Sequence, residues 1–523
     1  MQKVQLYDTT LRDGAQTEGI SYSVADKLKI AQKLDTLGIH YIEGGWPGSN
    51  PKDMEFFRLI RRGELKSAKI SAFGSTAKPG LLPEKDANIQ ALLKAETEIV
   101  TLFGKSWDLH VRDVLKTTLD ENLKMIFSSI KYLKEQGRRV IYDAEHFFDG
   151  ARSNLDYALK TLLAAQEAGA ETIVLCETNG GMVTSTLIQL IRQARSKVKL
   201  PLGIHTHNDS GLALANTIAA VEEGLTHIQG TINGYGERCG NADLLACVAI
   251  LQLKLGLACV RPEQLQKITE VSRYVSEISN MRHQTNQPFV GESAFAHKGG
   301  VHINAMVKHP LTYEHIKPAL VGNKSRFLVS ELSGRTSILL RAKEQKLGLE
   351  KETPQTKKIL KLLQNLEHRG YQFEAAEASF ELLMQKALKK YKKFFELEGF
   401  RVIIEKAKDG KLTSEAAIKL KVNNTKEHTA CEGDGPVNAL DNALRKALLE
   451  FYPTLAKMRL TDFKVRVLDE RAGTAARVRV LIQSQDEKDS WGTVGVSENI
   501  IEASWQALMD SVEYKLLKDK KQG

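Results

Sequence analysis

Residues 202–231, LGIHTHNDSGLALANTIAAVEEGLTHIQGT, contain one strand–helix–strand unit. Two short runs, Leu202–Thr206 and His227–Thr231, have the composition of strands, and the stretch between them, Gly211–Glu223, has the apolar spacing of a helix. Strands joined by helical crossovers are typical of a parallel sheet that is covered on both faces. The unit therefore predicts an α/β fold.

The same alternation of strands and helices fills the first 255 residues of the chain. The eight strand candidates are Val4–Asp8, Tyr41–Gly44, Ile70–Phe73, Ile99–Phe103, Val140–Ala144, Thr172–Cys176, Leu202–Thr206 and His227–Thr231. Eight such repeats in about 250 residues predict a closed (β/α)8 TIM barrel. A doubly wound open sheet is the alternative, but Thr9–Gly14 after the first strand lacks the G-x-G-x-x-G of a dinucleotide fold.

The composition is that of a folded, soluble protein with several domains. Of 523 residues, 42% are hydrophobic and 26% charged, which excludes a disordered or fibrous chain. The five cysteines are scattered and never spaced C-x-x-C, so a reducing cytoplasm is expected rather than a disulfide framework. No secretory signal and no run of about 18 apolar residues is found, so no membrane segment is expected.

The net charge of +10 leaves nucleic-acid binding open as an alternative. The basic runs lie in a helical stretch near Lys390 and in the C-terminal tail, where they have the pattern of solvated faces. We therefore expect small-molecule substrates and no nucleic-acid partner.

Three domains are expected. Residues 1–257 form the catalytic barrel, residues 258–392 form helical subdomains and a linker, and residues 393–516 form a C-terminal α+β domain in which residues alternate as in half-buried strands.

The C-terminal domain contains an internal pseudo-repeat. Thr429, Val437, Ala439, Ala443 and Leu444 recur as Thr493, Ile501, Ala503, Ala507 and Leu508, always 64 residues later. Each half is expected to contain strands and a helix, with a groove at the pseudo-axis where a small effector would bind.

The polar residues that follow the barrel strands indicate a functional site, because the sites of TIM barrels lie at the C-terminal ends of the strands. His205 and His207 are two apart in a strand, so their side chains point to one face and can share a divalent ion. Asp13, which follows the nearby first strand, is the expected third ligand. Two packed core histidines are the alternative.

Other residues on this rim have two possible roles each. Arg12 would donate to an oxyanion while Glu43 holds its guanidinium, or the two form only a structural pair. Thr178 would bind a carboxylate or cap a helix. Glu145 would act as a base or acid, or is a surface carboxylate.

Two motifs carry a resemblance to a known family. Leu11–Gln16 is followed after ten residues by Lys27, and Leu202–Ala213 has the form L-x-x-H-x-H-N-D-x-G-x-A. Together they resemble the signatures of the 2-isopropylmalate/homocitrate/citramalate synthase family, the synthase branch of the DRE-TIM metallolyases. Gly433–Ala439 resembles the regulatory (LeuA-like allosteric) domain of these synthases, so the resemblance covers nearly the whole chain.

The resemblance implies an acyltransferase that condenses acetyl-CoA with a 2-oxo acid in a Claisen-type reaction. Gly14–Gly19 and Gly44–Asp53 most resemble the branch that uses pyruvate. The implied products are (R)-citramalate and CoA, in isoleucine biosynthesis. A homodimer with isoleucine as feedback inhibitor is also implied.

The resemblance assigns a role to each matching residue. Asp13, His205 and His207 are the implied ligands of Mn²⁺, Mg²⁺ or Zn²⁺, with Asn241 in or near the coordination shell. Arg12 stabilises developing negative charge, Glu43 orients it, and Thr178 binds the 2-oxo acid carboxylate. His302 resembles the catalytic base, usually supplied by the partner subunit, with Glu145 as its acidic co-worker and Tyr313 as its support.

Substrate choice depends on the walls around the methyl group of pyruvate. Phe73, Leu102 and Tyr142, at three strand ends, are the predicted walls. Because one methylene group changes binding by only about 1–3 kcal/mol, a 2-isopropylmalate synthase is the first alternative. A metal-dependent acyl-CoA lyase and a non-catalytic sensor are further alternatives.

Overall fold

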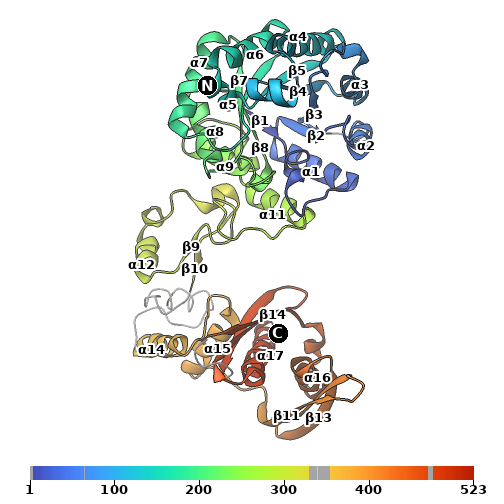
Figure 1. Ribbon diagram of the computed structural model, residues 1–523. Helices are drawn as coiled ribbons and strands as arrows, with labels where there is room; N and C mark the ends of the chain where they lie inside the picture. Colours follow the sequence, from blue (N-terminus) through green and yellow to red (C-terminus); the bar gives the residue numbers. More distant parts are fainter. Residues whose placement is uncertain (1–3, 64, 329–338, 340–353, 469–474, 523) are drawn as a thin grey trace. The chain divides into compact units, whose positions relative to one another are not determined.

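The computed structural model of the chain describes residues 4–63, 65–328, 339, 354–468 and 475–522. It divides into two compact units, Met1–Phe295 with Glu314–Ser325 and Ala296–Tyr313 with Arg326–Gly523 (Figure 1). Among the described residues, no helix combines the length and the apolar character needed to cross a membrane.

The first unit contains the predicted closed parallel barrel, with the strands in the order β1 to β8. Every predicted strand is present, and each end lies within two residues of its expected position. The strands are β1 (Gln5–Asp8), β2 (Tyr41–Gly45), β3 (Lys69–Ser75), β4 (Ile99–Lys105), β5 (Arg139–Glu145), β6 (Thr172–Glu177), β7 (Leu202–Thr206) and β8 (His227–Gly230). Pairing of Leu6 with Ile228 joins β1 to β8 and closes the ring.

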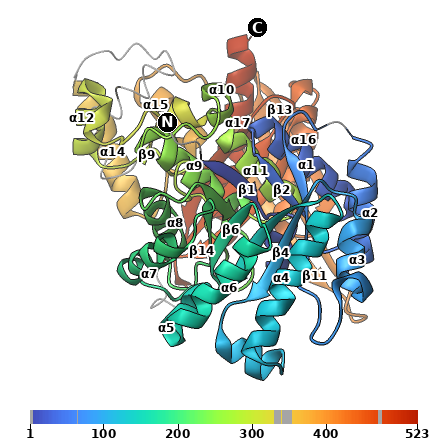
Figure 2. The ribbon, with the colours of Figure 1, turned by 90° about the horizontal axis from the view of Figure 1, so that it is seen from above.

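Helices cover the outside of the barrel, as α2 and α3 do in Figure 2. They are α1 (Val24–Leu37), α2 (Pro51–Ile60), α3 (Ala87–Lys94), α4 (Leu119–Glu135), α5 (Phe147–Ser153), α6 (Leu155–Glu167), α7 (Thr184–Lys197), α8 (Ala213–Glu222) and α9 (Leu244–Leu253), followed by α10 (Pro262–Leu265) and α11 (Ile268–Ile278). Several begin at residues whose side chains accept from the first turn, such as Ser23, Asp86 and Asn154.

Buried side chains fill the interior of the barrel. The cluster comprises Tyr7, Tyr41, Ile99, Ile141, Val174 and Cys176. The hydroxyl of Tyr7 donates to Glu43 Oε2 (2.8 Å) and lies 2.6 Å from Thr101 Oγ1, which adds a polar layer. As in other TIM barrels, the interior is a packed core, which leaves the C-terminal ends of the strands for a site.

A buried ion pair supports the end of β2. Lys27 Nζ donates to the carbonyl oxygen of Gly44 (3.0 Å) and to Asp53 Oδ1 (2.5 Å). The other oxygen of Asp53 accepts from the main-chain N–H of Trp46 (2.9 Å). The lysine of the first sequence motif therefore fixes the loop that carries Trp46.

We predict that Asp53→Asn lowers the free energy of unfolding of the barrel by about 3 kcal/mol, because it leaves the buried Lys27 charge without its partner. The midpoint of thermal unfolding should fall by about 6–12 °C. The control is Glu98→Gln, which weakens exposed ion pairs with Lys69 and Arg139 and should cost less than about 1 kcal/mol. Equal, small shifts for both variants would contradict the structural role of Lys27.

The second unit begins with a small lobe and continues into a helical segment. Strands β9 (Ala296–His297) and β10 (Arg326–Phe327) pair in parallel, and α12 (Gly300–Lys308) follows β9. Helices α14 (Pro354–His368) and α15 (Glu377–Ala387) lead into the C-terminal domain.

The C-terminal domain confirms the predicted pseudo-repeat. Its first half is an antiparallel sheet of β11 (Glu396–Lys406), β12 (Leu412–Val422) and β13 (Thr425–Gly433) with α16 (Pro436–Leu448); its second half is β14 (Arg459–Val467), β15 (Val478–Gln485) and β16 (Ser490–Ser497) with α17 (Ile500–Gln522). Thr429 Oγ1 donates to the carbonyl oxygen of Ala443 (2.9 Å), and Thr493 Oγ1 donates to that of Ala507 (2.8 Å). The same side-chain hydrogen bond therefore recurs at the same offset.

Candidate metal centre and substrate pocket

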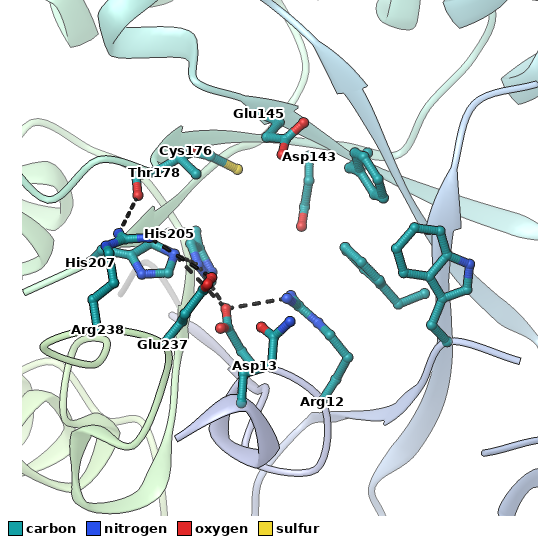
Figure 3. Close-up of a pocket in the computed structure, with 14 residues that line it drawn as sticks. Arg12, Asp13, Asp143, Glu145, Cys176, Thr178, His205, His207, Glu237 and Arg238 are labelled. Atoms are coloured by element: carbon teal, nitrogen blue, oxygen red, sulfur yellow. Dashed lines mark hydrogen bonds and ion pairs between the residues drawn. The ribbon is translucent and has the colours of Figure 1, made fainter. Parts of the chain in front are cut away.

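A cavity of about 200 Å³ opens at the C-terminal ends of the barrel strands (Figure 3). Its lining comprises Arg12, Asp13, Gln16, Trp46, Phe73, Phe103, Asp143, Glu145, Cys176, Thr178, His205, His207, Glu237 and Arg238. Figure 3 shows Asp13, His205 and His207 converging beside Arg12, with Glu145 on the opposite side. Most of the predicted site residues of the barrel therefore share one cavity.

The three predicted metal ligands are buried and adjacent. Asp13 Oδ2 lies 3.3 Å from His205 Nε2 and 4.0 Å from His207 Nε2. The two Nε2 atoms are 3.3 Å apart. These separations are those of donor atoms that share one ion. Among the described residues, these three form the group of His, Cys, Asp or Glu side chains whose donor atoms lie close enough to hold a metal ion.

The neighbouring contacts orient His205 toward the ion position. His205 Nδ1 lies 2.9 Å from Gln229 Oε1, and Gln229 Nε2 donates to Asp143 Oδ1 (3.0 Å). Because the amide oxygen of Gln229 can only accept, Nδ1 donates to it and Nε2 faces Asp13 and His207. Such a contact fixes the tautomer of a metal-bound histidine.

Asn241, on the loop after β8, supplies a fourth polar group. Its Nδ2 lies 3.0 Å from Asp13 Oδ2 and 3.2 Å from His205 Nε2. Its Oδ1 is buried and has no hydrogen-bond partner among the described residues. A half-turn of the amide would exchange the two atoms and place this oxygen among the ligands, so the residues present fit a divalent cation.

The electrostatics agree with this donor set. Although burial alone would raise it, Arg12 and His205 hold the pKa of Asp13 well below its usual range. Burial and the neighbouring His205 lower the pKa of His207 to about 3. Although burial alone would lower it, Asp13 raises the pKa of His205. The centre therefore offers a carboxylate and the neutral imidazole of His207, and a divalent ion would take the place of the proton that Asp13 favours on His205.

Arg12 connects the centre with the rest of the cavity. Its Nη1 lies 3.3 Å from Asp13 Oδ2, its Nε donates to Glu43, and its guanidinium carbon lies 3.9 Å from the centre of the Phe73 ring. Glu43 is fully buried. The expected Arg12–Glu43 pair is present, and Arg12 also lines the cavity.

Aromatic rings form one wall of the cavity and correct a prediction. Phe73 lines it as expected, stacked on Phe103 (5.2 Å between ring centres), and the edge of Trp46 meets both rings (5.8 and 5.4 Å). Leu102 and Tyr142, in contrast, belong to the core between strands and helices. They pair with each other across β4 and β5, and side chains alternate along a strand, so the next residues, Phe103 and Asp143, face the cavity.

Thr178 and Glu145 both lie on the rim. Thr178 is not a helix cap, because α7 begins at Thr184; its Oγ1 accepts from the main-chain N–H of His146 (2.9 Å). Glu145 forms an ion pair with Lys105 and is about a quarter exposed.

His302 and Tyr313 belong to the second unit. His302 lies on α12, and its ring stacks on that of Tyr313 with the ring centres 4.1 Å apart. The two residues that the resemblance pairs are therefore in contact within the unit.

Several lining residues were missed from the sequence. They are Gln16, Trp46, Phe103 and Cys176. Trp46 follows β2 directly, so its position at a strand end was the available signal. Phe103 and Cys176 carried no polar signal.

Comparison with known proteins assigns the chain to a family. The HMGL-like family matches residues 3–275, the homocitrate synthase post-HMGL domain-like family residues 289–370, and the LeuA allosteric (dimerisation) domain residues 374–516. An (R)-citramalate synthase of Geobacter sulfurreducens is 56% identical over 521 residues, which cover 99% of each chain. The chain belongs to the (R)-citramalate synthase family.

Other relatives agree with this assignment. An (R)-citramalate synthase of Aquifex aeolicus is 53% identical, covering 100% of this chain and 99% of the relative. A 2-isopropylmalate synthase of Methanocaldococcus jannaschii is 32% identical, covering 99% and 96%. The chain is thus much more similar to these citramalate synthases than to that isopropylmalate synthase.

We predict that Gln229→Met weakens manganese binding about 10- to 100-fold, because His205 loses the contact that fixes its tautomer. Isothermal titration calorimetry of the metal-free protein measures the dissociation constant. Gln264→Met, which changes a buried amide on α10, is the matched control and should bind manganese as the parent protein does. An unchanged dissociation constant for Gln229→Met would contradict the role of this contact.

Proposed function

We propose that the protein condenses acetyl-CoA with pyruvate and hydrolyses the thioester to (R)-citramalate and CoA. The observation that carries the proposal is the convergence of Asp13, His205 and His207 beside Arg12 in one cavity. Identities of 47–56% to (R)-citramalate synthases over nearly the whole chain support the same reaction. The protein works in the cytoplasm, where its five cysteines remain free thiols.

Asp13, His205 and His207, with Asn241, would hold a divalent ion, Mn²⁺, Mg²⁺ or Zn²⁺. When bound, such an ion polarises the carbonyl group of a 2-oxo acid. Arg12 donates to the oxygen on which negative charge develops, and its contacts with Glu43 and Phe73 hold the guanidinium in place.

Thr178 binds the carboxylate of the 2-oxo acid. Its Oγ1 accepts from His146, and among the described residues no group accepts the hydroxyl proton. Since Thr178 lines the cavity, that proton is available to a substrate oxygen.

His302 is the base that removes a proton from the methyl group of acetyl-CoA, with Tyr313 against its ring. The resulting carbanion forms the new bond to C2 of pyruvate, and the carbonyl oxygen of pyruvate takes the charge beside Arg12. Glu145, on the rim, assists proton transfer. Water then cleaves the thioester and releases CoA.

The aromatic wall favours pyruvate over 2-oxoisovalerate. Trp46 is fixed by its indole N–H, which donates to Asn88 Oδ1 (2.6 Å), and by the contact of its main-chain N–H with Asp53. A wall fixed in this way resists displacement by a bulkier side chain such as an isopropyl group. Formation of 2-isopropylmalate is the second candidate activity, because relatives of both kinds match the chain.

The proposal predicts that pyruvate gives the highest kcat/KM in an assay of CoA release. The purified protein with manganese is offered acetyl-CoA and, in parallel, pyruvate, 2-oxobutyrate, 2-oxoisovalerate or 2-oxoglutarate. Each added methylene or methyl group should lower kcat/KM about 10-fold or more. Preference for 2-oxoisovalerate would establish the second candidate, and no CoA release with any acid would overturn the proposal.

The C-terminal domain binds isoleucine as a feedback inhibitor and joins two chains in a homodimer. It has a cavity of about 570 Å³ between the two repeats, lined by Val437, Asn438, Asp441, Arg445, Met458, Arg459, Leu460, Phe463 and Leu508. Apolar side chains suit the branched chain of isoleucine, and Arg459 suits its carboxylate group.

We predict that Arg459→Gln raises the isoleucine concentration for half-inhibition at least about 10-fold, because a charge-assisted contact to the carboxylate is lost. The ratio of rates with and without isoleucine in the full-length protein is the readout. Arg401→Gln, an exposed position on β11 outside the cavity, is the matched control. Unchanged inhibition in Arg459→Gln would place the effector elsewhere.

A further inference from the structure

Arg238, on the loop after β8, joins the loops that follow three neighbouring strands. Its Nε and Nη2 donate to the two carboxylate oxygens of Asp209, after β7 (2.7 and 3.0 Å). The same Nη2 donates to the main-chain oxygen of Thr178, after β6 (2.7 Å; Figure 3). A two-point contact of this kind fixes orientation as well as distance.

Thr178 is held from its other side by the loop after β5. The main-chain N–H of His146 donates to Thr178 Oγ1 (2.9 Å). The ring of His146 is itself fixed, because its Nδ1 lies 3.1 Å from Asp149 Oδ2, an oxygen that also accepts from Asn179 Nδ2 (3.0 Å). Both the main chain and the hydroxyl of Thr178 are therefore restrained.

The backbone at both ends of this chain of contacts is in an unusual conformation. His146 and Arg238 each have a φ of 56°, in the left-handed region that side-chain-bearing residues seldom adopt. Such conformations persist where the surrounding contacts determine them, and they concentrate at functional sites. The loop geometry is thus set by the contacts to Thr178 and Asp209.

The ion pair itself does little for stability. The side chains of Arg238 and Asp209 are 40% and 24% exposed, and ion pairs that reach solvent to this degree contribute little. What the contacts determine is the direction of the Thr178 hydroxyl: its oxygen accepts from His146, so its proton points away from His146, on a residue that lines the cavity.

We infer that Arg238 and Asp209 are positioning residues for the 2-oxo acid carboxylate, acting through Thr178. The inference rests on the proposed function, in which Thr178 donates to that carboxylate. Arg238 does not act as a free charge toward the substrate, because both oxygens of Asp209 occupy its guanidinium. Asp209 is as necessary as Arg238, because it orients the guanidinium so that the guanidinium can donate to the carbonyl oxygen of Thr178.

The test compares Arg238→Gln, Asp209→Asn and the double variant in the full-length, manganese-loaded protein. Each single variant should raise the KM for pyruvate about 10-fold or more, with the KM for acetyl-CoA changed less than about 2-fold. The double variant should be no worse than the more affected single variant, because the two residues act as one unit. The ratio of the two KM values is the readout, since partial loss of folded protein lowers the apparent kcat and leaves both KM values unchanged.

Arg192→Gln is the matched control. Arg192 binds Glu223 through the same two nitrogens (2.9 and 2.7 Å), but it lies on α7 and does not line the cavity. Its KM for pyruvate should equal that of the parent protein. An increase as large as that of Arg238→Gln would show a general structural effect and overturn the inference.

Thr178→Val separates this inference from the proposed function. If Thr178→Val raises the KM for pyruvate and neither Arg238→Gln nor Asp209→Asn does, the positioning role is wrong and the function of Thr178 stands. If Arg238→Gln raises it and Asp209→Asn does not, Arg238 contacts the substrate directly and the inference is overturned. If Thr178→Val leaves the KM unchanged, the proposed role of Thr178 itself is wrong.

Discussion

The closure of the barrel between β1 and β8 is the constraint on which the site depends. Asp13 follows β1 and His205 and His207 belong to β7, so these residues meet only because the ring is closed. Strand β8 lies between β1 and β7 and supplies Gln229, whose amide holds His205. The loop after β8 adds Asn241 beside Asp13. One pairing of strands thus assembles both the donor atoms and the contacts that orient them.

Charge balance makes this assembly tolerable inside a protein. Asp13, His205 and His207 are at most 6% exposed, and an unpaired charge at that depth would be costly. The guanidinium of Arg12 faces both Asp13 and the buried Glu43, so each carboxylate has a cationic partner. The same guanidinium lies on Phe73, which connects the polar centre to the aromatic wall. Arg12 therefore contacts both the polar and the apolar side of the cavity.

The strands, the histidine pair and the rim carboxylates could be predicted from the sequence. Their prediction uses only the spacing of residues along the chain and does not require knowing which face of a strand points into the barrel. Residues two apart share a face in either case, so His205 and His207 were correctly placed together. To place Leu102 and Tyr142 correctly, one must know which face of each strand points into the barrel. Hydrophobicity does not reveal this, because the helices bury one face and the barrel interior buries the other. Asp143 was the available signal, because a carboxylate that points into the cavity requires the side chain of its neighbour Tyr142 to point outward. The contact of Arg238 with the Thr178 carbonyl depends on left-handed backbone at an arginine, which no pattern of residue types predicts.

The central claim is that the centre formed by Asp13, His205 and His207 holds one divalent ion and that the 2-oxo acid binds to this ion. Electron paramagnetic resonance of the manganese-loaded protein with ¹⁷O-labelled pyruvate tests it most directly. The account predicts one bound manganese per chain and hyperfine broadening by ¹⁷O in the carbonyl position, with manganese binding lost in Asp13→Asn. Saturated manganese binding without any ¹⁷O broadening, or full manganese binding in Asp13→Asn, would contradict the account.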